Sequence, residues 1–125
     1  MFYLGAACHL VQDVTIPQHA NVRLLDNHRS FENWIIRMHR RFHKFKVYKG
    51  GIYLNSIGKY IELNSREAIR THEKYSHIEN DHARFYKITS VVLVLAQKTT
   101  AGVMVKFYYD VQKLKAILLF KTFPR

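Results

Sequence analysis

One long stretch in the C-terminal part of the chain constrains the fold more than any other feature. From Phe85 to about Phe120 the sequence contains no turn signal except Gly102. The run Val91–Val94 by itself suits a buried strand, whereas the length of the whole stretch favours a helix. At 125 residues the chain fits one domain, and we expect residues 1–125 to form it.

The first third of the chain also has helical periodicity. Apolar residues recur at intervals of three and four until Pro17, which predicts a short first helix carrying Phe2, Leu4, Ala7, Leu10 and Val11 on one face. A loop is expected through Val22 to Asp26. Asn27 is a good N-cap for a second helix that ends near Phe45 and directs Phe31, Trp34, Ile35, Met38 and Phe42 inward.

The middle of the chain is less regular. Residues Lys46–Leu63 show no clear single period, and Gly50 and Gly51 interrupt them. Asn64 followed by Glu67 has the spacing of a capping box, which predicts a third helix from Ser65 to about Ile78. The predicted fold class is therefore all-α, a helical bundle.

Five side chains in the first third are candidate metal ligands. His9 and Asp13 are four residues apart, so both leave the same face of the first helix, and His28 and Glu32 repeat that spacing in the second. His19 lies just beyond Pro17, where a rigid turn can fold it back over the first helix.

The ligand types favour a catalytic zinc site. Two nitrogens and one carboxylate from His19, His28 and Glu32 leave a position open for water, and the sole cysteine, Cys8, excludes a cysteine-rich structural site. The alternative is that these are surface ion pairs, with Glu32 stabilising the N-terminus of its helix. The residues alone leave both interpretations open.

Three segments resemble a known family. FYLGAACHLVQDVTIPQHANV followed by NHRSFENW is similar to the zinc-dependent phospholipase C family of bacilli and clostridia, and AQKTTAGVMVKFYYD resembles the closing helix of that family. The resemblance implies an all-helical fold of the zinc-dependent phospholipase C and S1/P1 nuclease type. It also implies a truncated domain, because the family has a further N-terminal half that is not matched here.

The resemblance implies roles for the five candidate ligands. His19, His28 and Glu32 would hold one Zn²⁺, His9 would help to hold a second, and Asp13 would bridge the second ion to a third. The general base of the family belongs to the unmatched half, so no catalytic residue is assigned. Secretion is implied as well, although we expect no signal peptide in this sequence.

The charge of the chain favours anionic partners. Lysine and arginine number 20 against nine acidic residues, a formal charge of +11, which suits a phospholipid or membrane surface and nucleic acid alike. The resemblance favours the phospholipid or membrane surface, with nucleic acid as the less favoured partner. Arg37, Arg40, Arg41, Lys44, Lys46 and Lys49 are expected to form a solvated basic face beside His39 and His43. The longest uninterrupted apolar run, Val91–Ala96, predicts no transmembrane helix.

We therefore predict a zinc-dependent phospholipase C that hydrolyses the phosphodiester of phospholipids such as phosphatidylcholine to diacylglycerol and a phosphorylated headgroup. Two alternatives stay open. One is a zinc nuclease of the S1/P1 type, in which an aspartate usually follows the histidine where this chain has Glu32 after His28. The other is a noncatalytic basic remnant that binds zinc and membranes.

Overall fold

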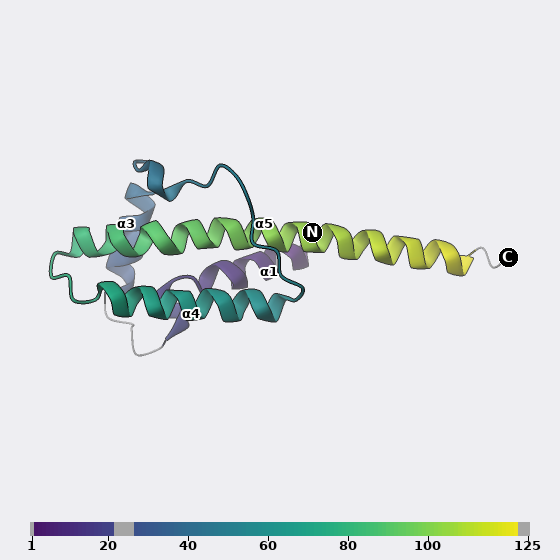
Figure 1. Ribbon diagram of the computed structural model, residues 1–125, viewed down its shortest axis with the longest axis horizontal. Helices are drawn as coiled ribbons and strands as arrows, with labels where there is room; N and C mark the ends of the chain where they lie inside the picture. Colours follow the sequence, from purple (N-terminus) through teal and green to yellow (C-terminus); the bar gives the residue numbers. More distant parts are fainter. Residues whose placement is uncertain (1, 22–26, 123–125) are drawn as a thin grey trace.

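One long helix, α5, organises the structure. The computed structural model describes residues 2–21 and 27–122, and every element within them is helical, which confirms the all-α prediction. Figure 1 shows α1 (Phe2–Asp13) and α4 (Ile57–Tyr75) lying along the first half of α5 (Asp81–Thr122). The strand interpretation of Val91–Val94 is wrong, because these residues lie inside α5.

Two apolar clusters attach the shorter elements to α5. The first is mainly aromatic and joins α3 (His28–Met38) and the 3-10 helix η2 (His43–Phe45) to the start of α5 through Phe31, Trp34, Phe45, Phe85, Ile88 and Val92. Its rings meet edge to face, a favourable arrangement of their quadrupoles. The second cluster joins α1 and α4 to the middle of α5 through Cys8, Val11, Tyr60 and Val103.

Helix α3 ends at Met38, earlier than the predicted end near Phe45. The ring of His39 explains the difference, because its Nδ1 lies 2.9 Å from the carbonyl oxygen of Ile36 and can satisfy a group that the helix end leaves unpaired. Phe45 therefore belongs to η2 and not to α3. Its side chain is buried, and its carbonyl accepts a 2.6 Å hydrogen bond from the side chain of Gln97 in α5.

Helix α4 begins eight residues before the predicted start at Ser65, at Ile57. Its N-cap is Ser56, whose hydroxyl accepts a hydrogen bond from the backbone of Lys59. Asn64 does not cap a helix, because it lies fully buried inside α4. Its amide nitrogen donates to the carbonyl of Val11 at 2.7 Å and to the hydroxyl of Thr99 at 3.0 Å, so one polar side chain ties α4 to both α1 and α5.

Gly102 marks a close approach of two backbones. A Cβ atom at this position would lie 1.8 Å from the carbonyl oxygen of Ile52 and 2.5 Å from the hydroxyl of Tyr60. The segment around Ile52 crosses α5 here, and its backbone N–H donates a 3.0 Å hydrogen bond to the carbonyl of Lys98. Glycine is therefore required for packing, and α5 continues through it without a turn.

The basic segment between α3 and α4 faces solvent. The six cations that the sequence predicts to form a basic face are all exposed: Arg37, Arg40, Arg41, Lys44, Lys46 and Lys49. They lie at the end of α3 and on the chain that follows it, so the basic surface is confirmed although most of it is not helical.

Over Asp81–Leu119, α5 is long and apolar enough to cross a membrane by length and composition. The uninterrupted run Val91–Ala96 did not indicate this, because single polar residues divide the apolar stretch. The core helix of a soluble protein satisfies the same test, and 33% of the apolar window is buried inside the structure.

Candidate metal centre

A tight turn between α1 and α2 brings His19 back to the end of α1. The N–H groups of Thr15 and Ile16 donate to the carbonyls of Gln12 and Asp13, each at 3.0 Å. Pro17 then begins the short helix α2 (Pro17–Ala20), because proline suits the first position of a helix. The sequence did not predict this short helix. The fold-back predicted for His19 is thereby confirmed.

The first turn of α3 supplies the facing side chains. Asn27 occupies the N-cap position as predicted, in a left-handed conformation and without a side-chain capping hydrogen bond. His28 and Glu32 follow one helical turn apart, and the Nε2 atom of His28 lies 3.0 Å from the Oε1 atom of Glu32. The predicted loop Val22–Asp26 lies outside the described residues.

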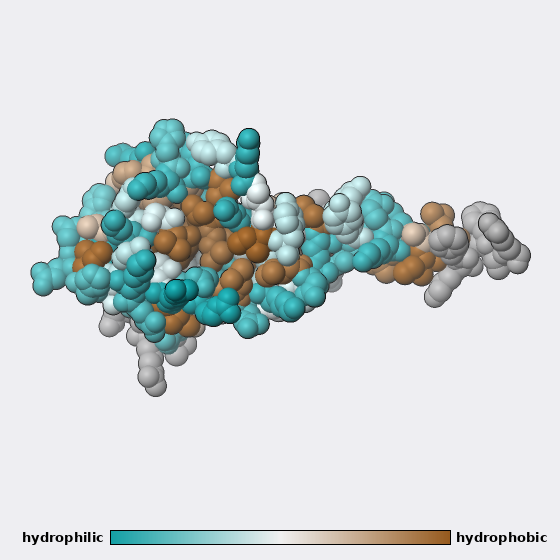
Figure 2. Space-filling view, viewed as in Figure 1, coloured by the Kyte–Doolittle hydropathy of each residue, from teal (hydrophilic) through white to brown (hydrophobic). Residues whose placement is uncertain are grey.

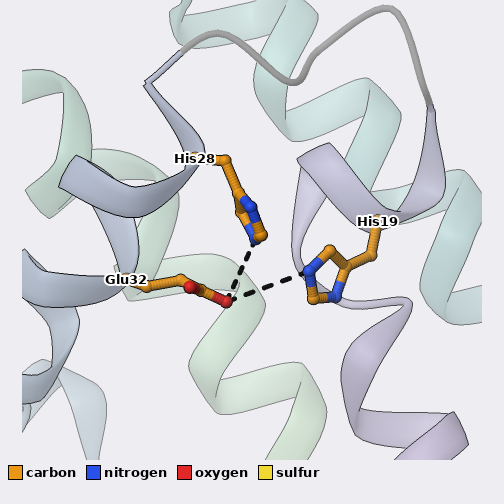
Figure 3. Close-up of side chains that lie close together, drawn as sticks. All are labelled: His19, His28 and Glu32. Atoms are coloured by element: carbon orange, nitrogen blue, oxygen red, sulfur yellow. Dashed lines mark ion pairs between the residues drawn. The ribbon is translucent and has the colours of Figure 1, made fainter.

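Three of the five candidate ligands converge on one point. Figure 3 shows His28 and Glu32 of α3 and His19 of α2 pointing toward one another. Their nearest ligand atoms all lie within 4.8 Å of one another, and Nε2 of His19 is 3.8 Å from Oε1 of Glu32. Ligand atoms bound to one tetrahedral zinc lie roughly 3.4 Å apart. The distances of 3.0 and 3.8 Å fall on either side of that value.

The surroundings of the Nε2 atom of His28 also suit a metal ligand. Nε2 of His28 is buried, and its 3.0 Å contact with Oε1 of Glu32 does not have the geometry of a hydrogen bond. A buried imidazole nitrogen that faces a carboxylate and a second imidazole suits metal coordination, because a bound cation would satisfy all three groups. The side chains of His19 and His28 are 26% and 28% exposed, which leaves the centre accessible from solvent.

Asp13 lies on the other side of His19. Its Oδ1 is 3.3 Å from Nδ1 of His19, whereas Nε2 of the same ring faces Glu32. Carboxylates commonly hold the second nitrogen of a metal-bound histidine in this way and so determine its tautomer. His9 is further out, with 72% of its side chain exposed and its Nε2 3.9 Å from Oδ2 of Asp13. The five residues thus divide into a group of three and a pair next to it.

An open groove of about 600 Å³ begins at the Asp13 side of this centre. His9, Gln12 and Asp13 line one wall. Most of the opposite wall consists of apolar side chains of α5: Val92, Leu93, Ala96, Ala101 and Met104. No local sequence pattern indicates this wall, because only the packing of α1 against α5 brings the two sides together. The 3.0 Å hydrogen bond from Gln12 to Thr100 connects them.

Comparisons of the chain with family models, with curated proteins and with solved structures found no match. The resemblance to zinc-dependent phospholipase C therefore stays a prediction from sequence. The structural result is a three-residue group, His19, His28 and Glu32, that can hold a metal ion.

Proposed function

We propose that the chain binds Zn²⁺ through His19, His28 and Glu32 and is a phosphodiester hydrolase of the zinc-dependent phospholipase C type. The observation that carries the proposal is the convergence of two imidazoles and one carboxylate from two separate helices within 4.8 Å. This ligand set leaves a fourth position for water or substrate, the pattern of a catalytic zinc site.

The surroundings of the centre favour a phospholipid over a soluble phosphate ester. A phosphodiester placed at the three ligands would lie next to the groove, whose apolar wall on α5 offers a surface to the hydrocarbon chains of a lipid. The formal charge of +11 raises the local concentration of anionic lipid at the surface of the chain.

The residues of the chain have separate tasks in this proposal. His19, His28 and Glu32 hold the ion, and the carboxylate of Asp13, 3.3 Å from Nδ1 of His19, orients the ring so that Nε2 is the ligand atom. Bound zinc would polarise a phosphoryl oxygen and lower the pKa of water. His9, exposed at the mouth of the groove, would contact the headgroup side of the substrate.

The test combines metal content with hydrolysis by the same purified chain. We expect about one zinc per chain, the capacity of a single three-ligand site. His28→Ala and Glu32→Gln should each abolish stoichiometric zinc binding and the release of phosphocholine from phosphatidylcholine vesicles. His77→Ala removes an exposed histidine outside the centre and should change neither.

The alternatives give different outcomes in this test. Zinc binding without hydrolysis would identify a noncatalytic zinc protein, an outcome favoured by the finding that only one three-ligand group occurs among the described residues. Cleavage of single-stranded nucleic acid instead of lipid would identify a nuclease. Zinc content that is unaffected by both substitutions would refute the site itself.

A further inference from the structure

The last part of α5 extends beyond the rest of the structure. Figure 1 shows it continuing past the ends of α1 and α4, and Figure 2 shows brown, hydrophobic residues near its end. The exposed large hydrophobic side chains of this projection (residues 104–119) include Met104, Val105, Phe107, Tyr108, Tyr109, Leu114 and Ile117. At about 100° per residue these positions surround the helix, with no gap wider than about 80°. A helix that is apolar on every side is typically enclosed by other segments of protein.

The buried side of α5 continues into the projection. Buried residues follow one another along α5 at intervals of three and four residues as far as Thr99 and Val103. The same intervals then lead to four exposed positions: Phe107, Asp110, Leu114 and Ile117. This spacing is typical of a helix that packs along another helix. The pattern of a helix contact therefore extends past the point where α1 and α4 cover α5.

A hollow of about 180 Å³ lies where the projection leaves the other helices. Leu4 and Ile57 line it from the ends of α1 and α4, and Phe107 and Asp110 line it from α5. An apolar cavity of about 150 Å³ holds one benzene ring, so this hollow has room for an aliphatic side chain. It lies beside the same side of α5 on which the three- and four-residue intervals continue.

A second copy of the chain running antiparallel would supply that side chain. In an antiparallel pair of helices the facing residue numbers have a constant sum, so a register that sets Met104 against Leu119 also sets Asp110 against Lys113. Ile117 of each copy then lies at the level of the hollow of the other copy. Asp110 is the only acid between residues 104 and 119, and two-fold symmetry brings it to a lysine twice.

The exposed surface of the projection also matches a dimer interface in size. Each exposed large hydrophobic side chain contributes on the order of 100 Å², which gives roughly 700 Å² per chain. A stable complex buries about 800 Å² per partner. Other occupants fit less well, because a bilayer surface requires an apolar side opposite a polar one, and a nucleic acid would leave the aliphatic side chains exposed.

We propose that the projection of α5 pairs with the same segment of a second copy in an antiparallel dimer with two-fold symmetry. Leu114 and Ile117 of each copy cover the hollow at the base of the other projection. Asp110, which pairs with Lys106 at 2.7 Å within one chain, gains Lys113 of the other copy as a second cation. This inference does not depend on zinc binding, because none of the three ligands belongs to α5.

Sedimentation over a concentration series tests the proposal. Each copy has a formal charge of +11, so the measurement is made in about 0.3 M salt, which screens the repulsion between copies. The dimer should form with a Kd of about 10 μM or below. Ile117→Gln should weaken it at least about tenfold, because each substitution occurs twice in the interface. Ile36→Gln replaces another isoleucine that is more than half exposed, on α3, and should stay within about twofold.

Exchange of charges tests the antiparallel register. Asp110→Lys and Lys113→Asp should each weaken dimerisation about tenfold, because like charges then face one another. An equimolar mixture of the two variants should form heterodimers about as tightly as the unsubstituted chain dimerises, since both facing pairs are again of opposite charge. Lys115→Asp is the control, because it makes the same change of charge on another side of the helix. Mixing it with Asp110→Lys should not restore dimerisation.

Three results would overturn the proposal. One is a chain that stays monomeric at about 100 μM. Another is an equal loss of dimer in Ile117→Gln and Ile36→Gln. The third is a mixture of Asp110→Lys and Lys113→Asp that dimerises no better than the mixture of Asp110→Lys and Lys115→Asp. All three are measured without metal or lipid, so the failure of this proposal can be distinguished from failure of the proposed hydrolase function.

Discussion

The Oδ1 atom of Asp13 lies 3.3 Å from the Nδ1 atom of His19, on the side of the ring opposite to Glu32. In this position the carboxylate can orient the imidazole and does not have to bind the same ion. The family resemblance predicts a bridging ligand at Asp13, so the two roles differ in a measurable way.

Asp13→Asn should weaken zinc binding about 10- to 100-fold without abolishing it, which is the usual effect of losing the partner of a metal-bound histidine. Titration with a competing chelator measures the affinity. Asp110→Asn, which alters another helical aspartate in an ion pair with a residue one turn away, is the control. Complete loss of zinc in Asp13→Asn, equal to that in Glu32→Gln, would show that Asp13 is itself a ligand.

Gly102→Ala should lower the free energy of unfolding by about 1–3 kcal/mol, because the new methyl group would meet the backbone of Ile52. Urea denaturation measures the change. Gly5→Ala provides the contrast, since a Cβ at Gly5 meets nothing within 4 Å, and alanine should stabilise helix α1 by about 0.5–1 kcal/mol. Equal effects of the two substitutions would contradict the close crossing of Ile52 over α5.

Asn64→Leu should destabilise the chain by about 2–3 kcal/mol. It leaves the buried carbonyl of Val11 without its donor and removes the hydrogen bonds that join α4 to α1 and α5. Asn33→Leu makes the same chemical change at an exposed position of α3 and should cost less than about 0.5 kcal/mol. The two free energies of unfolding are again compared in urea. A small effect at Asn64 would be inconsistent with its role in joining the three helices.

The stability of the chain should fall as the pH falls below about 6.5, partly through His72. Burial and the nearby Arg84 lower the pKa of His72 from its ordinary value of 6.5, and Glu73 opposes them. The unfolded chain therefore takes up the proton at a higher pH than the folded chain does. The stability due to neutral His72 is complete above that value and is lost as pH falls through the lowered pKa.

Thermal unfolding between about pH 5 and 8 measures this dependence. The melting temperature of His72→Gln should vary less with pH than that of the unsubstituted chain. His77→Gln, an exposed histidine near the same end of the structure, should keep the full dependence. An unchanged pH dependence in His72→Gln would exclude His72 as its source.

Local sequence features predicted several elements correctly. The absence of turn signals from Phe85 onward predicted the main part of α5, although the helix begins earlier, at Asp81. Spacing of four residues placed His28 next to Glu32, because one turn of an α-helix brings such side chains together whatever surrounds them. The turn at Pro17 similarly predicted the return of His19, which depends on only a few neighbouring residues.

The errors concern residues whose roles depend on distant segments. Asn64 has the sequence pattern of a cap and is in fact a buried hydrogen-bond donor to α1 and α5. Gly102 has the pattern of a turn and is instead the site where Ile52 crosses the helix. In both cases the partner lies dozens of residues away along the chain, so no local window contains it.

The sequence by itself determined the helical class, the long C-terminal helix and the residues able to hold a metal, because periodicity and short spacings act within single helices. Only the tertiary structure decided which ligands converge. Because α2 packs against α4 and α3 packs against α5, His19 meets the pair His28 and Glu32, and Asp13 lies on the other side of the His19 ring. The same packing leaves the end of α5 without cover, since burial depends on which helices reach a residue and not on the residue alone.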